Sequence, residues 1–375
     1  AYLARYGKRA RFAAEATEER SVAWVVTGKA ERAAQSFADL ARNAKRLELS
    51  RYQHLESVAL EYAGRREQAQ AGFRRVMNDH PLSFAALAAA ARLEAHGVAV
   101  PPMPAAVVAS AAPGELLVKL PPDAELLHRI GLDREAELAL ADVERQVAQN
   151  FPDQGDRALC MLYRRLASAE RCFRVGYRAA TWEELSVPPR SDRRWLWECV
   201  YPRPYAALVQ HYAADQGVES DLIYAVMRQE SGFRPEIVSP AKAVGLLQIL
   251  PSTGERLAGE LGEVFDAEYL RHPPVNVRLG ARYLRKLIDV FDGSLPLAVA
   301  SYNAGPNAVL NWLEGSRDLD LDLFVARIPY SETRSYVERV LSNYARYRYL
   351  TGGEVAIPRL AMNLPTPRTD GVELY

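Results

Sequence analysis

The stretch DLIYAVMRQESGFRP, residues 221–235, places an acid where a helix ends. At roughly 100° per residue, Glu230 falls on the same helical face as the apolar side chains of residues 222–227. Gly232 and Pro235 follow and predict the end of the helix, so that the carboxyl group would face a cleft. A carboxyl group in apolar surroundings loses hydration, which favours its protonated form and suits a general acid.

The rest of this helix gives two further expectations and one alternative. Ser220 is a candidate N-cap. Tyr224 and Arg228 are expected on the side of the helix opposite to Glu230. From this segment alone, the alternative is that Glu230 is an ordinary carboxylate, solvated or paired with Arg228 or Arg234.

Three later segments also end or begin helices with polar residues. In SPAKAVGLLQILPSTGERLA (239–258), Gln248 is the one polar residue of an apolar run, and Pro251 begins a helix. A lone Gln in such a run is more often a core amide than a ligand contact. In AVASYNAGPNAVLNWLEG (298–315), Gly305 ends a helix and leaves Tyr302 and Asn303 at its terminus. Such residues suit sugar rings, but they also cap helices.

The third segment, IPYSETRSYVERVLSNYARYRYL (328–350), begins a long helix. Ser331 is the expected N-cap, and Glu332 lies in the first turn, where the helix dipole favours an acid. The tyrosines that follow have spacings more typical of packing than of a binding surface.

The remaining chain is mostly helical in pattern. Apolar residues recur at three- and four-residue steps in AERAAQSFADLARNA (30–44) and in residues 62–81, typical of an irregular, tetratricopeptide-like α-solenoid. Prolines break the pattern between residues 99 and 122. The expected organisation is therefore a helical superhelix at 1–98, a Pro-rich linker at 99–122, a helical linker domain at 123–195, a catalytic domain at 196–350 and an extended or mobile tail at 351–375.

Composition narrows the functional classes. Lys and Arg together number 47 and equal the 47 Asp and Glu, which argues against broad electrostatic capture of nucleic acid. No nucleotide-binding loop or metal-binding motif is present, so neither a cofactor nor a metal is expected. Cys160, Cys172 and Cys199 are expected to be buried free thiols, with one disulfide and a spare thiol as the alternative. The chain begins AYLARYG, which predicts a mature or trimmed fragment.

RQESGFRP, GLLQILPSTG, SYNAGP and IPYSETRSYV occur in the order and rough spacing found in family 1 lytic transglycosylases, and the chain resembles the soluble Slt type most closely. The likeness covers residues 200–350, and HPLSFAALAAAARL (80–93) also resembles the Slt helical region. The resemblance implies a mostly α fold, in which a superhelix precedes a lysozyme-like α+β catalytic domain with a small β element. It also implies non-hydrolytic cleavage of the bond between N-acetylmuramic acid and N-acetylglucosamine in peptidoglycan, with a 1,6-anhydro product.

The resemblance assigns roles residue by residue. Glu230 matches the sole general acid and base, and the substrate-binding positions are Ser239, Gln248, Tyr302, Asn303 and Glu332. Many relatives have methionine at the positions of Leu247 and Leu250, which leaves the subsite preference open.

Two alternatives remain. A goose-type lysozyme-like muramidase would need a second carboxylate to activate water, for which Glu236, Asp266 and Glu332 are candidates by sequence proximity. An inactive cell-wall scaffold is the other alternative. The expected partners are peptidoglycan glycan strands and, through the helical region, cell-wall proteins. A periplasmic location is expected from the substrate.

Overall fold

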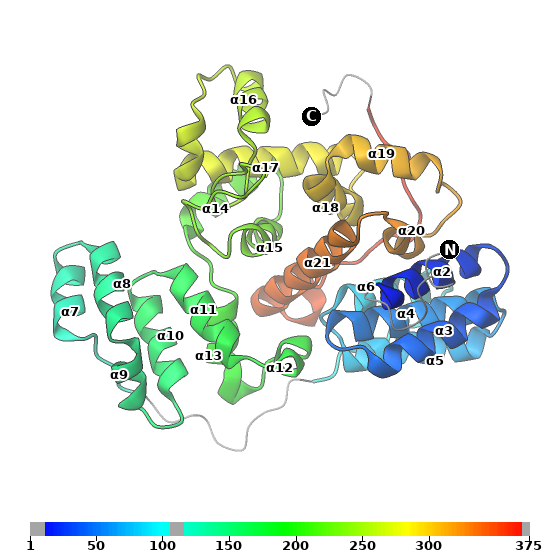
Figure 1. The fold of residues 1–375 in the computed structure, drawn as a ribbon, viewed down its shortest axis with the longest axis horizontal. Coiled ribbons are helices and arrows are strands. Elements are labelled where there is room, and N and C mark those ends of the chain that lie inside the picture. The colour runs from blue at the N-terminus through cyan, green and yellow to red at the C-terminus, as the bar shows by residue number, and fades with distance from the viewer. Residues whose placement is uncertain (1–11, 106–115, 370–375) are drawn as a thin grey trace. The chain divides into compact units, whose positions relative to one another are not determined.

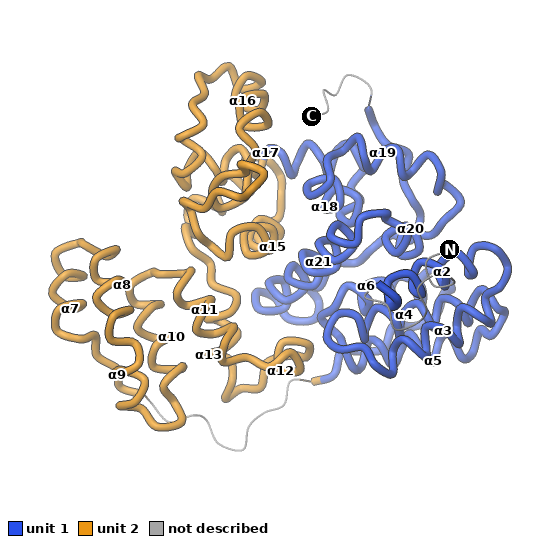
Figure 2. The backbone as a smooth tube through the Cα atoms, viewed as in Figure 1, with its two compact units in different colours: residues 1–104, 282–375 blue, residues 105–281 orange. Residues whose placement is uncertain are grey.

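The computed structural model describes residues 12–105 and 116–369, and the chain forms two compact units (Figure 2). Unit 1 contains residues 1–104 and 282–375, and unit 2 contains residues 105–281. Residues 1–11, 106–115 and 370–375, which belong to the expected superhelix, linker and tail, lie outside the described residues. The domain limits expected from the sequence therefore remain a prediction.

The first half of unit 1 is an array of helices in which each packs against the next along the chain (Figure 1). The apolar positions at helical spacing turn inward, so that Phe37, Leu55, Val58 and Phe73 are at most 2% exposed. Gly64, at φ +79°, lies in the turn between the third and fourth helices of this array. The array consists of α2 (Ala13–Val26), α3 (Ala30–Asn43), α4 (Leu47–Tyr62), α5 (Arg66–Asp79) and α6 (Phe84–Ala95).

The second half of unit 1 comes from the end of the chain and packs on the same array. Contacts join α2 with α20, α6 with α21, and α18 with α21. The helices of this half are α18 (Leu295–Ala304), α19 (Pro306–Glu314), α20 (Leu321–Arg327), α21 (Ser331–Gly352) and the short η3 (Glu354–Ala356). The long helix α17 (Pro273–Val290) carries the chain from unit 2 into unit 1.

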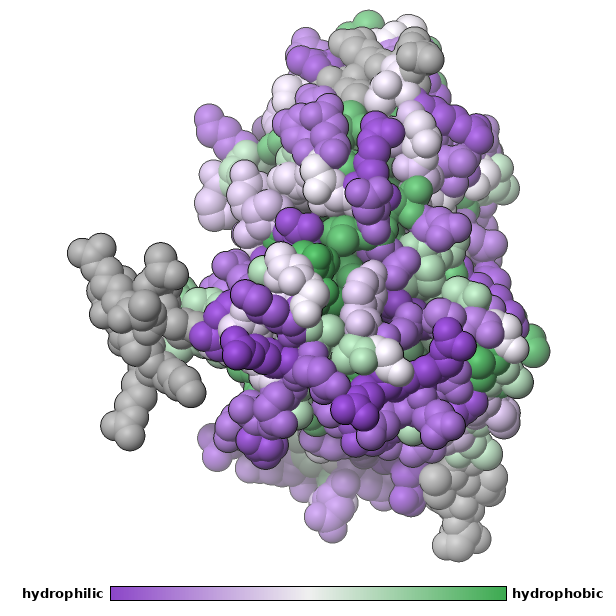
Figure 3. All heavy atoms as spheres, turned by 90° about the vertical axis from the view of Figure 1, so that its right-hand side faces the viewer, coloured by the Kyte–Doolittle hydropathy of each residue, from purple (hydrophilic) through white to green (hydrophobic). Residues whose placement is uncertain are grey.

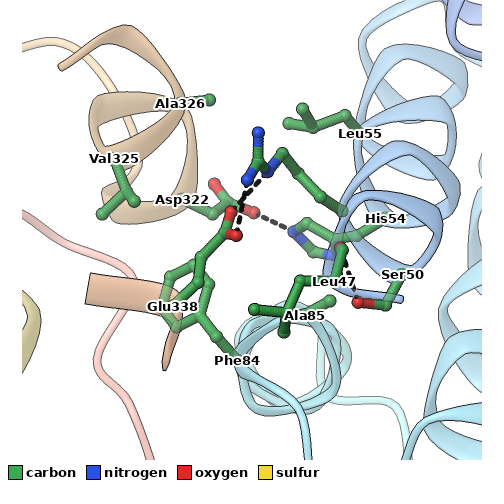
Figure 4. Close-up of a pocket in the computed structure, with 11 residues that line it drawn as sticks. Leu47, Ser50, His54, Leu55, Phe84, Ala85, Asp322, Val325, Ala326 and Glu338 are labelled. Atoms are coloured by element: carbon green, nitrogen blue, oxygen red, sulfur yellow. Dashed lines mark hydrogen bonds and ion pairs between the residues drawn. The ribbon is translucent and has the colours of Figure 1, made fainter. Parts of the chain in front are cut away.

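Buried ion pairs join the two halves of unit 1. Arg51 donates through Nε and Nη2 to the carboxylate of Glu338, at 2.7 and 2.8 Å. His54 Nε2 lies 2.7 Å from Asp322 Oδ2 (Figure 4). All four residues of these pairs line a cavity of about 20 Å³. The side chains of His54, Asp322 and Glu338 are at most 7% exposed, so these pairs are inside the protein.

Unit 2 begins with short helices, within the region 123–195 that the sequence pattern predicted to be helical. Gly131, at φ +81°, allows the first break, and a second occurs at Val143. The helices are α7 (Pro122–Arg129), α8 (Asp133–Asp142), α9 (Glu144–Gln149), α10 (Gly155–Arg165), α11 (Ala169–Ala179), α12 (Trp182–Ser186), η1 (Ser191–Arg193), α13 (Arg194–Val200), α14 (Ala206–Gln216), α15 (Ser220–Glu230), α16 (Pro251–Glu260) and η2 (Ala267–Arg271).

The cysteines lie in the core of unit 2, and the expectation of three free thiols is wrong. Cys160 in α10 and Cys199 in α13 form a disulfide, while Cys172 in α11 is a buried free thiol. The sulfur of Cys172 lies 2.6 Å from that of Cys199. The alternative of one disulfide with a spare thiol is confirmed. Burial raises the pKa of Cys172 to about 12, so this thiol is protonated at neutral pH.

The described residues contain no sheet. Where the resemblance implied a small β element, isolated bridges join Val244 with Val238 and with Ile249. None of the helices in the described part of the chain combines the length and the apolar character that crossing a membrane requires. On the face drawn in Figure 3, hydrophilic side chains cover most of the surface and hydrophobic ones form smaller groups.

Candidate active site

Glu230 is the last residue of α15 and is partly buried. Residues 221–227 before it are all buried, so the helix delivers the carboxylate from inside unit 2. The chain then turns sharply through Gly232 at φ +56° and Phe233 at φ +70°. Ser231 stabilises this turn, because its hydroxyl donates to Met227 O and accepts from Phe233 N, both at 3.0 Å. The predicted end of the helix is therefore confirmed.

One expectation about α15 is wrong. Ser220 is the first helical residue and Glu219 is the N-cap, without a capping side-chain hydrogen bond. Tyr224, expected on the side of the helix opposite to Glu230, is also buried and is 2% exposed. Its hydroxyl donates to Pro204 O at 3.0 Å. α15 is buried on more sides than a surface helix because unit 2 packs around it.

An aromatic cluster holds the end of α15. The guanidinium carbon of Arg228 lies 4.8 Å from the ring centroid of Phe173 and 4.7 Å from that of Tyr201. Arg228 Nε donates to Val200 O at 3.1 Å. Phe173 also packs edge-on against Phe233, in the turn after Glu230, with ring centroids 5.6 Å apart. Contacts with α11 and α13 therefore fix both sides of Glu230 along the chain.

Ser239 and Gln248 lie in one hydrogen-bonded loop of unit 2. Ser239 Oγ accepts from Ala243 N at 3.0 Å. Gln248, at φ +49°, donates through Nε2 to Ile237 O at 3.2 Å and to Gly245 O at 2.8 Å. These two carbonyls identify the amide nitrogen, and Gln248 Oε1 has no hydrogen-bond partner among the described residues.

Asn276, in α17, organises this loop and was missed in the sequence. It is fully buried, and its Nδ2 donates to Val244 O at 2.9 Å and to Leu270 O at 2.8 Å. Its Oδ1 accepts from Leu247 N at 2.8 Å. A single amide thus satisfies three main-chain groups beside Gln248. The signal in the sequence was a lone Asn on the apolar face of an otherwise regular helix.

The two leucines that replace methionine occupy different environments. Leu247 is fully buried, and its side chain packs against Gly280 of α17. Leu250 is 42% exposed and directly precedes α16. Of the two positions, only Leu250 has a side chain exposed at the surface.

Tyr302, Asn303 and Glu332 belong to unit 1. Tyr302 and Asn303 lie in the last turn of α18, which ends before Gly305 at φ +84°, as predicted. Asn303 Oδ1 accepts from Thr333 Oγ1 at 2.6 Å, which connects α18 with the first turn of α21. Glu332 lies exposed in that same turn. Ser331 is the first residue of α21 and not its N-cap, which is Tyr330.

Tyr283 is a second residue that the sequence did not single out. Its ring packs against that of Tyr302 with centroids 5.3 Å apart. Burial raises the pKa of Tyr283 to about 12, so its hydroxyl is protonated at neutral pH. Tyr283 and Thr333 thus position Tyr302 and Asn303, while Asn276 positions the loop of Gln248.

The model of the transglycosylase SLT domain matches residues 207–325, and the model of the soluble lytic transglycosylase helical domain matches residues 327–355. The chain therefore contains an SLT transglycosylase domain and is similar to soluble lytic transglycosylases. The SLT domain contains Glu230, Ser239, Gln248, Tyr302 and Asn303. The helical-domain match contains Glu332.

The curated relatives of this chain include soluble lytic murein transglycosylases. The soluble lytic murein transglycosylase of Salmonella typhimurium is 34% identical over 182 residues, which are 47% of this chain and 28% of the relative. That of Escherichia coli K12 is 34% identical over 177 residues, covering 46% of this chain and 27% of the relative. The chain therefore spans less than a third of the length of these relatives.

Solved structures share the fold. The 70 kDa soluble lytic transglycosylase of Escherichia coli superimposes with a TM-score of 0.70 at 21% identity, covering 95% of this chain and 55% of that one. An inactive variant of lytic transglycosylase Slt from Pseudomonas aeruginosa has a TM-score of 0.64 at 24% identity, covering 96% and 54%. The expected fold, a helical superhelix with a lysozyme-like domain, is confirmed.

Proposed function

We propose that this chain is a peptidoglycan lytic transglycosylase with Glu230 as its only general acid and base. The observation that carries the proposal is the place of Glu230, which ends a buried helix inside the SLT domain with fixed contacts on both sides. The relatives' names support it, since they describe murein transglycosylases. Further support comes from the Pseudomonas protein, in which a glutamate-to-glutamine variant is described as inactive.

In the proposed reaction, the Glu230 carboxyl group first protonates the glycosidic oxygen while the bond from that oxygen to C1 of N-acetylmuramic acid breaks. The positive charge that develops at C1 lies beside the carboxylate that has just formed. The same carboxylate then removes the proton of the C6 hydroxyl as O6 attacks C1. The products are an N-acetylglucosamine 4-hydroxyl end and a 1,6-anhydromuramic acid end, and no water is consumed.

This route needs no second carboxylate, and two candidates for one are already engaged. Glu236 is exposed and pairs with Arg134 at 3.2 Å. Asp266 Oδ1 accepts from Glu268 N at 2.9 Å and caps η2. Glu332 is exposed in the first turn of α21. The engagement of Glu236 and Asp266 favours the transglycosylase over a muramidase that activates water.

The remaining residues are proposed to hold the glycan. Gln248 presents its amide oxygen as an acceptor for a sugar N–H or O–H, because its nitrogen is already used twice. Tyr302 offers an aromatic ring to a sugar face, and Ser239 and Asn303 offer polar groups. Glu332 is proposed to meet the peptide stem. A 70 kDa soluble lytic transglycosylase of the same fold has been solved in complex with bulgecin A. Action in the periplasm and docking of cell-wall proteins on the helical region remain proposals.

A digest of purified peptidoglycan, analysed by mass spectrometry, tests the proposal. We expect soluble fragments that end in anhydromuramic acid and are lighter than hydrolysis products by one water. Fragments with a reducing end would contradict the proposal and would show that the chain is a hydrolytic muramidase. If no fragments are released by a chain that circular dichroism shows to be folded, the inactive scaffold is the alternative that remains.

A further inference from the structure

Unit 1 contains a cavity of about 350 Å³ far along the chain from Glu230. Its walls come from α5, α6, residues 100–103 and residues 354–360. The apolar lining includes Met77, Leu87, Val100, Met103, Ile357 and Leu360. Two segments that the catalytic proposal leaves unused, the start of the Pro-rich stretch and the C-terminal tail, thus form two of its walls.

The cavity is too large to be an ordinary packing gap. Protein interiors hold few voids larger than one water molecule, whereas ligand pockets begin at roughly 300 Å³. The inner faces of α5 and α6 are closely packed, with Phe73 and Leu93 at most 1% exposed. The cavity therefore lies on the sides of α5 and α6 that face away from this packed core. Mostly apolar walls offer few of the hydrogen bonds that ordered water needs.

Among the charged residues that line the cavity, one cation is available to pair with a ligand. Arg359 forms an ion pair with Glu94. Glu354 Oε1 accepts from the main-chain N–H of Met103 at 2.6 Å. Arg74 also lines the cavity, is exposed, and makes no hydrogen bond or ion pair with any described residue. The two acids are thus engaged by a cation and an N–H, and Arg74 remains for an incoming anion.

Hydrogen bonds hold residues 354–360, the C-terminal wall of the cavity, in place. Leu321 N donates to Met362 O at 2.7 Å, and Arg348 Nε donates to Ala356 O at 2.9 Å. The extended tail expected from the sequence is therefore fixed to α20 and α21 on either side of residues 357–360. A wall held in this way keeps its shape without a ligand, which lowers the entropy cost of binding.

We propose that this cavity binds a small amphiphilic anion, namely a carboxylate with an aliphatic body of medium chain length. The aliphatic body would fill the space between Met77, Leu87 and Leu360, and the carboxylate would pair with Arg74 at the mouth. The proposal is independent of the transglycosylase reaction, because none of its residues is assigned to the glycan.

Titration calorimetry of the whole chain with octanoate tests the site, with 1-octanol as the uncharged analogue. We expect one saturable site that binds octanoate about tenfold or more tightly than octanol, because only the carboxylate meets Arg74. Arg74→Glu should weaken octanoate binding by about the same factor. The matched control is Arg75→Glu on the same helix, since Arg75 pairs with Glu56 at 3.8 Å and does not line the cavity. That control should bind like the wild type.

A second pair of variants tests the aliphatic part. Ala90 lines the cavity, so Ala90→Trp should fill it and abolish binding of both octanoate and octanol. Ala71→Trp, at an exposed position of α5, is the control and should leave binding unchanged. Thermal unfolding must show that each variant is folded. The proposal is overturned by the absence of saturable binding to the wild type, by equal losses in Arg74→Glu and Arg75→Glu, or by unchanged binding in a folded Ala90→Trp variant.

Discussion

Arg92 and Asp322 form a buried two-pronged ion pair, in which Nε and Nη2 of the arginine each donate to a carboxylate oxygen at 2.7 Å. Their side chains are 3% and 2% exposed. The third arginine nitrogen, Nη1, donates to Glu61 Oε1 at 3.0 Å. The pair joins α6 in the helical array to α20, and the charges have no access to water if either partner is lost.

Asp322→Asn should therefore lower the free energy of unfolding by as much as about 3–5 kcal/mol, because it removes the fully buried partner of Arg92 and leaves only the more exposed carboxylates of Glu61 and Asp320. Urea denaturation followed by circular dichroism measures the change. Asp289→Asn is the control, since Asp289 pairs with Arg285 at an exposed carboxylate and should cost less than about 1 kcal/mol. Equal effects of the two variants would contradict the role given to the buried pair.

Two buried acids of unit 1 predict opposite pH dependences. Burial works to raise the pKa of Asp322, but Arg92 and the hydrogen bonds from His54 and Arg92 outweigh it and hold the pKa below its ordinary value. Burial and the neighbouring Glu18 raise the pKa of Glu338 despite Arg51. The stabilisation from Asp322 is thus present above its unfolded pKa of about 3.9 and is lost as the pH falls. Glu338 instead reduces stability as the pH rises above about 4.3, because its folded form retains the proton longer.

Unfolding measured across this acidic range separates the two residues. The cost of Asp322→Asn should shrink as the pH is lowered below about 4. The stability of Glu338→Gln relative to the wild type should increase as the pH is raised above about 4.3. Parallel pH profiles for the two variants would show that the assigned directions are wrong.

Glu230→Gln keeps the size of the side chain and removes its acid. We expect turnover of peptidoglycan to fall by at least about a hundredfold, the usual contribution of a general acid, with unchanged thermal unfolding. Glu236→Gln alters an exposed carboxylate six residues later and should retain near-normal turnover. If Glu236→Gln were the inactive variant, the carboxylate of Glu236 would be the essential one and the muramidase scheme would gain support.

Gly245→Ala tests the loop that carries Gln248. Gly245 has φ +83°, and an added Cβ would lie 2.3 Å from Asn276 Nδ2 and from Leu270 O. Gly262→Ala is the matched control, because Gly262 has φ +70° but no atom within 4 Å of the added carbon. The control should cost about 1–2 kcal/mol for its backbone conformation alone. Gly245→Ala should cost about 1–3 kcal/mol more, because Asn276 must move, and should also reduce turnover. Equal losses of stability in the two variants would show that Asn276 and Leu270 make room for the added Cβ without a cost in free energy.

Local rules predicted the parts of the fold that depend on neighbours in sequence. Ser83 caps α6 as expected, since its Oγ accepts from Ala86 N at 3.1 Å. Pro251 begins α16, and α18 ends before Gly305. Ser220 and Ser331 were wrong as N-caps by one residue, because the preceding residue already has the extended backbone of a cap. A residue type alone does not distinguish the cap from the first helical position.

Residues that act across long stretches of chain could not be predicted. The partners of Asn276 include Val244, 32 residues away, and those of Arg92 include Asp322, 230 residues away. Neither of these sequence separations can be deduced from the periodicity of the apolar residues. The disulfide likewise required α10 and α13 to meet, and the spacing of Cys160 and Cys199 gives no such information. Glu230, Tyr302 and Asn303, by contrast, were singled out because they lie where helices end, and Ser239 was assigned by the resemblance alone.

The pairing of the first and last thirds of the chain in unit 1 also sets the order in which the protein is able to mature on the ribosome. Arg92 is synthesised 230 residues before Asp322, which at usual elongation rates is a delay of about ten to fifty seconds. Throughout that interval Arg92 has Glu61 as a partner but lacks the second carboxylate, that of Asp322. A shortened product that stops before α20 would lack this buried ion pair permanently, so we expect it to be less stable than the complete unit 1.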